Sequence, residues 1–371
     1  MSLNVGSFFA GAGGLDFGFQ NAGFNLLWAN ELEKSFCDSY AGLVGHDSHP
    51  GDFWLEHRKM PDVDVIIGGP PCQSFSLVGK RLSEDPRGKL VSGFKDLIIE
   101  RRPRAFLLEN VPGLAASKFN GERLPDYLVQ EFQKAGYTML KEKVDATDSF
   151  VPQRRKRLIL IGVLNPSDEL RPVTRESFAK HLLKRTGIEF SLSNTTSADA
   201  LSDLPKASVE LVSRYDRQPS SPYAKLMRIG AGDSVSLQRP PTMSALDREF
   251  VNHIPPGGNY LDIPDEISTQ RILNFKATGG RTTTYGRLAA DQPSYTVNTY
   301  FNRPNVGSNY HYEELRLITV REALRLQSFP DRFTPKFKSQ RELHVQIGNA
   351  VPPLMAESLA LTMKSALGAK K

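Results

Sequence analysis

The sequence has few cysteines, no long apolar run and no terminal targeting signal. Its two cysteines, Cys37 and Cys72, argue against a disulfide framework, and neither lies in a Cys-x-x-Cys pair typical of zinc or redox sites. We therefore expect no metal centre. The sequence contains no run of about 18 apolar residues, and this argues against a membrane span. The N-terminus lacks a basic segment followed by a long apolar one, so we expect a cytoplasmic protein.

The composition is that of a globular protein that can bury a core. Hydrophobic residues make up 39% of the 371 residues and charged residues 24%. At about 150 residues per domain, the length suits one large and one smaller domain. The formal net charge of +6 favours a polyanionic partner such as nucleic acid, although many basic proteins bind none.

The first part of the chain, to about residue 165, alternates short apolar runs with helix-like segments. This alternation predicts an α/β fold with a doubly wound parallel sheet. One amphipathic stretch, 124–135, predicts a helix between two strands. The predicted strands cover residues 5–9, 26–29, 63–67, 105–108 and 158–163.

Beyond residue 165 the pattern changes. Proline, serine, threonine, arginine and glycine become frequent and the apolar runs become short, which indicates a second, smaller lobe extending to about residue 320. Helix periodicity returns at 319–326, where Thr319 precedes Glu322 as in a capping box. A final helix is predicted after Pro352 and Pro353.

A glycine-rich turn follows the first predicted strand. Gly11 and Gly13 stand between this strand and a helix pattern, where glycines let a ligand approach the backbone at a helix N-terminus. The motif indicates a nucleotide-type pocket or only a tight turn. Glu31 follows the second strand, where a ribose diol is usually held. A solvated glutamate at a helix start is the alternative.

A thiol and a carboxylate follow the third and fourth predicted strands. The Gly-Gly-Pro-Pro-Cys motif at 68–72 presents Cys72 where active sites of open α/β sheets lie, whereas Cys37 fits the usual buried position of a free cysteine. Together with Glu109, Cys72 is suited to covalent catalysis assisted by an acid. Arg155 and Arg157 alternate into the fifth strand, either as a solvated face or with both guanidiniums at one site.

These motifs, in this order, resemble the DNA (cytosine-5)-methyltransferase family over nearly the whole chain. Each motif alone is weak, but six in the family's order are specific. The matching segments are Phe-Ala-Gly-Ala-Gly-Gly at 9–14, Pro-Pro-Cys-Gln at 70–73, Glu-Asn-Val at 109–111, Gln-Arg-Arg-Lys-Arg at 153–157, Arg-Glu-Ala-Leu-Arg-Leu-Gln-Ser-Phe-Pro at 321–330 and Gly-Asn-Ala-Val-Pro-Pro at 348–353.

The resemblance implies an enzyme that moves a methyl group from S-adenosylmethionine to carbon 5 of a cytosine flipped out of double-stranded DNA. It implies a Rossmann-like catalytic and cofactor-binding domain over 1–175, an irregular target-recognition domain over 176–320, and a C-terminal segment, 321–371, that returns to the catalytic domain. The base must be flipped because a thiol cannot reach a stacked one.

The resemblance also assigns roles to single residues. Cys72 would add to carbon 6, Glu109 would hold and protonate ring nitrogen 3, and Arg155 and Arg157 would position the thiol and the base. Thr296 matches a threonine that contacts the flipped nucleotide's backbone, unless it is an ordinary strand residue. The implied cofactor residues are Phe9, Gly11, Gly13, Glu31, Asp52, Phe53, Pro71, Leu90 and Asn349, and the implied substrate residues are Gln73, Ser76 and Thr296.

The predicted recognition lobe carries cationic residues suited to DNA contacts, although the sequence does not indicate which of them reads a base. They are Arg228, Arg239, Arg248, Lys276, Arg281 and Arg287.

Three alternatives compete with a monomeric modification enzyme that has a cognate restriction endonuclease. A solitary regulatory methyltransferase would have the same sequence features. The tRNA cytosine methyltransferases share the catalytic motifs, but their recognition lobe is smaller and the residues after Glu-Asn-Val differ from the Pro-Gly found here. A catalytically dead DNA-binding or cofactor-sensing module is opposed by the intact Cys72, Glu109, Arg155 and Arg157.

Overall fold

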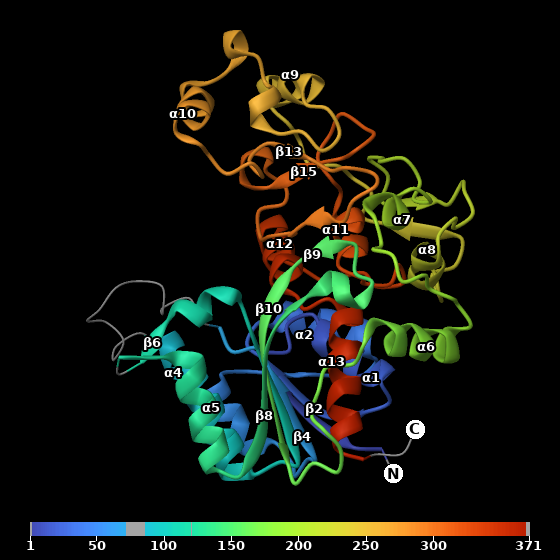
Figure 1. Cartoon of the computed structure of the whole chain (residues 1–371). Helices are drawn as coiled ribbons and strands as arrows, with labels where there is room; N and C mark the ends of the chain where they lie inside the picture. The colour runs from blue at the N-terminus through green and yellow to red at the C-terminus, as the bar shows by residue number, and fades with distance from the viewer. Residues whose placement is uncertain (1, 72–85, 120, 369–371) are drawn as a thin grey trace. The chain divides into compact units, whose positions relative to one another are not determined.

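A computed structural model describes residues 2–71, 86–119 and 121–368 (Figure 1). The chain divides into two compact units. The first unit comprises Met1–Asp145, Lys156–Thr174 and Pro353–Lys371, and the second comprises Ala146–Arg155 and Arg175–Pro352. Both units are therefore built from segments that are distant in the sequence.

The first unit is organised around one seven-stranded sheet. Its strands are β1 (Asn4–Phe8), β2 (Asn25–Glu31), β3 (His49–Pro50), β4 (Val65–Gly68), β5 (Ala105–Asn110), β8 (Tyr137–Asp145) and β10 (Lys156–Leu164), in the order β3-β2-β1-β4-β5-β10-β8. The first five are parallel, and β10 is antiparallel to both its neighbours. The order reverses between β1 and β4, and ligands of open α/β sheets bind at the carboxyl ends of strands at such a point.

This sheet confirms the predicted doubly wound α/β fold. It adds strands β3 and β8, which the sequence analysis did not predict, and its β10 is antiparallel where a parallel strand was predicted. β8 is one of the two edge strands, and its Lys141, Glu142 and Lys143 are exposed. Charged residues are common on edge strands because they discourage pairing with other chains. The same charges break the apolar run on which a strand prediction depends.

Helices cover both faces of the sheet. Helices α4 (Pro86–Arg101) and α5 (Leu124–Lys134) lie on one face, and α1 (Gly14–Asn21) and α13 (Pro353–Ala366) lie on the other (Figure 1). The remaining elements of the unit are α2 (Lys34–Val44), α3 (Phe53–Glu56), the 3-10 turns η1 (His57–Lys59) and η2 (Pro112–Ala116), and a short hairpin of β6 (Lys118–Phe119) and β7 (Glu122–Arg123).

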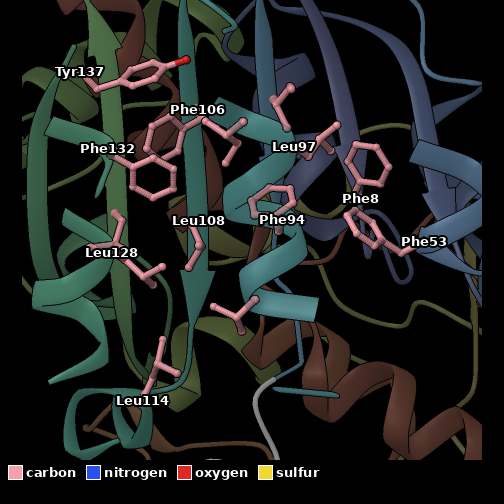
Figure 2. Packing of buried hydrophobic residues seen from close by; sticks show 14 of the residues in the cluster. Phe8, Phe53, Phe94, Leu97, Phe106, Leu108, Leu114, Leu128, Phe132 and Tyr137 are labelled. Carbon is pink, nitrogen blue, oxygen red and sulfur yellow. The ribbon is translucent and has the colours of Figure 1, made fainter. Parts of the chain in front are cut away.

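An aromatic core holds α4 and α5 against the sheet (Figure 2). The ring of Phe94 in α4 lies edge-on to Phe8 of β1 at 6.2 Å, and the ring of Phe132 in α5 lies 4.2 Å from Phe106 of β5. All four side chains are fully buried. Burying one such side chain contributes roughly 1.5–3 kcal/mol, so this cluster fixes the helices that flank the strand ends.

The other face depends on close contact between α1 and α13. A Cβ added at Gly18 would stand 2.4 Å from Ala356 Cβ and 2.6 Å from the Pro353 carbonyl oxygen. Lys364 donates a hydrogen bond to the carbonyl of Ala22, the residue that ends α1, at 2.7 Å. The last described helix is thereby joined to the first one.

The second unit consists mainly of short helices and two-stranded pairs around its own apolar cluster, which includes Phe250, Ile254 and Tyr310. Its elements are η3 (Ala146–Ser149), β9 (Gln153–Arg154), α6 (Arg175–Thr186), α7 (Ser197–Leu201), β11 (Val212–Arg214), α8 (Pro222–Met227), β12 (Ser234–Ser236), α9 (Ala245–His253), η4 (Tyr260–Asp262), η5 (Asp265–Ile267), α10 (Gln270–Thr278), β13 (Gly286–Arg287), β14 (Ser294–Tyr295), η6 (Pro304–Val306), β15 (Ser308–Tyr310), α11 (Val320–Leu326) and α12 (Gln340–Asn349).

The C-terminal part of the chain contributes helices to both units. The predicted capping box of Thr319 and Glu322 is confirmed at the start of α11. Helices α11 and α12 belong to the second unit, whereas α13 belongs to the first. The helix predicted after Pro352 and Pro353 is confirmed as α13. Within the residues that the structure describes, no helix is both long and apolar enough to span a bilayer.

Two glycine-to-alanine variants test the packing of α1 on α13. Gly18→Ala should lower the free energy of unfolding by about 1–3 kcal/mol, because the new methyl group overlaps backbone atoms of α13. Gly42→Ala is the matched control: Gly42 is exposed in α2, and no described atom lies within 4 Å of its Cβ position. It should raise stability by about 0.5–1 kcal/mol. Equal midpoints of urea unfolding for the two variants would contradict this packing.

Candidate active site

The carboxyl end of β1 leads into the predicted glycine turn, which is tied to the end of β2. Gly13 has a left-handed backbone, with φ of 87°, and stands immediately before α1. The Gly11 N–H donates a 2.8 Å hydrogen bond to Glu31 Oε2, and the Ala10 N–H donates to the Asn30 carbonyl at 3.1 Å. No described atom lies within 4 Å of a Cβ position at Gly11. The turn thus leaves open space beside a carboxylate.

The segment after β2 brings two aromatic rings together. The Asn30 amide donates hydrogen bonds to the His49 and Gly51 carbonyls, both at 3.0 Å, which holds β3 beside β2. Phe53, at the start of α3, stacks on Phe9 with ring centroids 5.3 Å apart and an interplanar angle of 26°. Phe53 belongs to the apolar cluster of this unit, and Phe9 and Leu90 of α4 pack against that cluster. Three of the predicted cofactor residues, Phe9, Phe53 and Leu90, are therefore gathered in one place.

Asp52 caps the helix that carries Phe53. Its Oδ1 accepts a hydrogen bond from the Trp54 N–H at 2.8 Å, while the residue remains exposed. Because Asp52 and Phe53 are adjacent in the chain, this cap sets the start of α3 and with it the position of the Phe53 ring. The Asp52 carboxylate therefore has a structural role, as the cap of α3, that does not depend on a ligand.

A buried polar network that the sequence analysis missed lies beneath the glycine turn. Asp16, in the first turn of α1, is fully buried and accepts a 3.0 Å hydrogen bond from the Tyr40 hydroxyl. That hydroxyl also lies 3.3 Å from His46 Nε2. A Cβ at Gly13 would stand 2.9 Å from the Tyr40 ring, so this ring requires the glycine. The sequence signal that could have indicated this network is a charged residue on the buried face of a short helix.

The predicted acid, Glu109, is held by Arg157. Ile159 of β10 lies opposite Glu109 of β5, so Arg157 lies diagonally across on the same face of the sheet. Arg157 Nε is 2.7 Å from Glu109 Oε1, and the two side chains are only 8% and 11% exposed. Since β10 is antiparallel, its beginning meets the carboxyl end of β5. This reversal places a cation next to Glu109.

The end of β4 is shaped to approach Glu109. A Cβ at Gly69 would stand 2.8 Å from Glu109 Oε2, so a larger residue would displace the carboxylate. The Asn110 amide donates a 2.9 Å hydrogen bond to the Pro70 carbonyl, which fixes the backbone just before the exposed Pro71. The predicted Cys72, Gln73 and Ser76 lie outside the described residues.

Arg155 has different partners from Arg157. It belongs to the second unit, is fully buried, and donates hydrogen bonds to the carbonyls of Val297 at 3.0 Å and of Gly348 and Ala350 at 2.8 Å each. The alternation of the two arginines thus leads to two separate sets of contacts. That Arg155 also positions a base stays a prediction.

The structure places the remaining predicted residues in the second unit. The Thr296 hydroxyl donates to the Arg154 carbonyl at 2.7 Å, directly after the parallel pairing of β14 with β9. Asn349 is exposed and is the last residue of α12. Gln153, which the sequence analysis did not select, is fully buried and bonds both the Leu326 carbonyl and the Val297 N–H.

Comparison with known families agrees with this geometry. The family model for C-5 cytosine-specific DNA methylases matches residues 3–365. The chain belongs to this family. The methylase is 31% identical to the type II methyltransferase M.MthTI of Methanothermobacter thermautotrophicus, over 99% of its own length and 98% of that protein's. It is also 31% identical to the type II methyltransferase M.NgoFVII of Neisseria gonorrhoeae, over 95% of its own length and 84% of that protein's.

Solved structures of methyltransferases share the fold of this methylase. A chain described as a DNA modification methyltransferase encoded within an E. coli prophage matches with a TM-score of 0.73 and 24% identity, covering 99% of this chain and all of that one. The S. pombe Dnmt2 methyltransferase matches with a TM-score of 0.60 and 14% identity, covering 98% of this chain and 99% of that one. The predicted methyltransferase fold and enzyme class are confirmed.

The network beneath the glycine turn predicts a pH dependence of stability. Burial raises the pKa of Asp16 from its usual 3.8 to about 6. A raised pKa means that the folded state holds the proton more tightly than the unfolded chain does. The contribution of Asp16 is therefore fully present below about pH 4 and is lost as the pH rises to about 6.

The variant Asp16→Asn isolates this effect, because its amide oxygen can still accept from Tyr40. The unfolding free energy of the variant relative to the parent should rise by about 2 kcal/mol from pH 4 to pH 7. Asp38→Asn, at a side chain that is 47% exposed, should show a much smaller change in urea unfolding. A pH-independent difference for Asp16→Asn would refute the assignment.

Proposed function

We propose that this DNA cytosine methylase modifies carbon 5 of a cytosine flipped out of duplex DNA, through a covalent bond to Cys72. The observation that carries the proposal is the position of Glu109. Its carboxylate is buried, paired with Arg157, and stands against Gly69, at the strand end from which the chain continues through Pro70 and Pro71 to Cys72. An acid beside a thiol is what covalent catalysis on a pyrimidine requires.

The residues at the end of β1 and β2 fit S-adenosylmethionine. Open space at Gly11 suits a ligand that approaches bare backbone, Glu31 can accept hydrogen bonds from a ribose diol, and the stacked rings of Phe9 and Phe53 offer an apolar surface to adenine. When bound, S-adenosylmethionine supplies an electrophilic methyl group. We propose further contacts from Gly13, Asp52, Pro71, Leu90 and Asn349, as the family resemblance implies.

In the proposed reaction the Cys72 thiolate forms a bond to carbon 6 of the cytosine. The electron pair of the ring's 5,6 double bond becomes available at carbon 5 while Glu109 gives a proton to nitrogen 3. After carbon 5 has received the methyl group, it loses its own proton to a base. The carbon–sulfur bond then breaks, Cys72 leaves as a thiolate, and nitrogen 3 returns its proton, which restores the aromatic ring.

Other residues are proposed to position the reactants. Arg157 holds Glu109 and keeps its carboxylate oriented, since an ion pair this buried has few alternative geometries. Arg155 bonds the carbonyl of Val297, the residue after Thr296, and we propose that Thr296 contacts the backbone of the flipped nucleotide. Gln73 and Ser76 are proposed to contact DNA as well. Residues 176–320 are the proposed target-recognition region, and 1–175 with 321–371 the proposed catalytic region.

We further propose that the methylase protects host DNA in a restriction–modification system. The curated relatives described above are named type II methyltransferases, and the chain covers nearly their whole length. A monomer acting on cytoplasmic DNA, with a cognate endonuclease that cuts the same sequence, is the corresponding proposal. Bisulfite sequencing of host DNA with and without the gene would identify the modified sequence.

The role of Glu109 predicts the behaviour of Glu109→Gln. An amide cannot supply a proton to nitrogen 3, so methyl transfer to unmethylated duplex DNA should slow by about 10²- to 10⁴-fold, whereas binding of DNA and cofactor persists. Glu169→Gln, at a side chain that is 73% exposed, is the matched control and should methylate at the parental rate. A parental rate for Glu109→Gln would exclude the proposed role.

The covalent intermediate predicts a trapped complex. Fluorine at carbon 5 cannot leave as a cation, so a duplex with 5-fluorocytosine in place of every cytosine should stay bonded to the enzyme when S-adenosylmethionine is present. The complex should survive denaturing electrophoresis. Cys72→Ala should abolish it, whereas Cys37→Ala, at a buried cysteine of α2, should not. A trapped species that persists in Cys72→Ala would overturn the mechanism, and a tRNA transcript should give none.

A further inference from the structure

A turn that follows Thr296 is seated firmly on helix α12. Phe301 is fully buried, and its ring lies edge-on to His344 with centroids 4.7 Å apart. At the other end of the helix, a Cβ on Gly348 would stand 2.4 Å from the Thr299 nitrogen, so the turn passes directly over the helix end. The turn, residues 298–303, therefore has two separate anchors on α12.

Arg155 adds a third anchor from within. Its guanidinium donates hydrogen bonds to the Val297 carbonyl, just before the turn, and to the Gly348 and Ala350 carbonyls at the end of α12. One buried cation thus bonds both segments, which keeps the turn and the helix in a fixed relation. Groups carried by the turn and by the first residues of α12 are preorganised for the same reason.

These anchored segments carry two guanidiniums around one phenol. The guanidinium of Arg303 lies 4.9 Å from the centre of the Tyr300 ring, and that of Arg341, in the first turn of α12, lies 5.5 Å from it. Arg341 Nη1 is also 3.4 Å from the Tyr300 hydroxyl. The hydrogen bond from Arg341, then its positive charge and that of Arg303, lower the pKa of this hydroxyl. Tyr300, Arg303 and Arg341 are called the arginine platform below.

The positive charges of the arginine platform are available to a ligand. Arg303 and Arg341 are both exposed, and within the part of the chain that the structure describes no ion pair joins either guanidinium to a carboxylate. The arginines of the same unit that have such partners behave differently: Arg325, for example, is buried between Asp203 and Asp331. The two guanidiniums lie around one ring and no carboxylate of the described residues neutralises them. An anion that contacts both would therefore bind favourably.

We propose that the arginine platform binds a phosphodiester group of the DNA backbone. Guanidiniums match the geometry of phosphate oxygens and can bond them in pairs, and the Tyr300 ring holds both planes by cation–π contact before the DNA arrives. Phosphate contacts set the register of a protein on a duplex without reading its sequence. The inference rests on the proposed function only in taking duplex DNA as the substrate.

Binding of a labelled random-sequence duplex, measured by fluorescence anisotropy over a range of salt concentrations, tests the proposal. Each lost phosphate contact should lower the slope of log affinity against log salt by about 1. Arg303→Gln and Arg341→Gln should each show this loss, and the double variant about twice as much. Arg171→Gln removes an equal charge from an exposed ion pair in the first unit and should leave the slope unchanged.

The Tyr300 variants separate the two parts of the arginine platform. Tyr300→Phe keeps the ring and should bind as the parent does, whereas Tyr300→Ala removes the support of both guanidiniums and should weaken binding. In methylation assays on unmethylated genomic DNA, the arginine variants should raise KM for DNA without changing KM for S-adenosylmethionine. The variants should therefore weaken the positioning of DNA without weakening the binding of the cofactor.

Three outcomes would overturn the proposal. In the first, the salt slopes of the arginine variants equal the slope of the parent. In the second, these slopes fall no further than the slope of Arg171→Gln. In the third, affinity falls only for duplexes that carry the target sequence, which would mean that the arginine platform reads bases. None of these outcomes depends on methyl transfer. Failure to trap a 5-fluorocytosine complex would instead reject the proposed mechanism and leave this binding result intact.

Discussion

The ion pair between Arg157 and Glu109 depends on the one strand that runs against its neighbour. In an all-parallel arrangement the beginning of β10 would lie at the opposite edge from the end of β5, and no cation at position 157 could reach Glu109. The antiparallel pairing brings them to 2.7 Å. Burial makes the pair costly to break, since removing one partner of a buried ion pair typically costs about 3–5 kcal/mol. The carboxylate is consequently held where the neighbouring strands end.

Side-chain hydrogen bonds to backbone groups fix the ends of the other strands beside the end of β5. Asn110 holds the Pro70 carbonyl, Asn30 holds the segment that leads to Phe53, and Glu31 accepts from the Gly11 N–H. Each of these side chains bonds backbone from a neighbouring strand or loop. Backbone groups at strand ends have lost their ladder partners, so such bonds satisfy them and also fix the backbone around these strand ends.

The sequence predicted what local pattern and motif order encode. Five strands, the helix at 124–135 and the capping box of Thr319 depend on neighbours in the chain, and each is found. Strand β8 was missed because its exposed lysines and glutamate hide the apolar period. The contact of Asp16 with Tyr40 and the arginine platform were missed because they depend on distances between residues far apart in the sequence. The split of 321–371 between two units has the same cause, since only packing assigns a helix to a unit.

The fate of the cations shows why net charge is a weak guide to DNA contacts. Arg321 and Arg325 are fully buried, and Arg325 is enclosed by Asp203 at 2.8 Å and Asp331 at 2.6 Å. In the predicted recognition region, Arg287 donates to three backbone carbonyls and Lys276 is paired with Asp265. These charges are satisfied internally, so they attract a polyanion less than their number suggests. The cations available to a polyanion are those that the fold leaves exposed and without a carboxylate partner, which composition does not reveal.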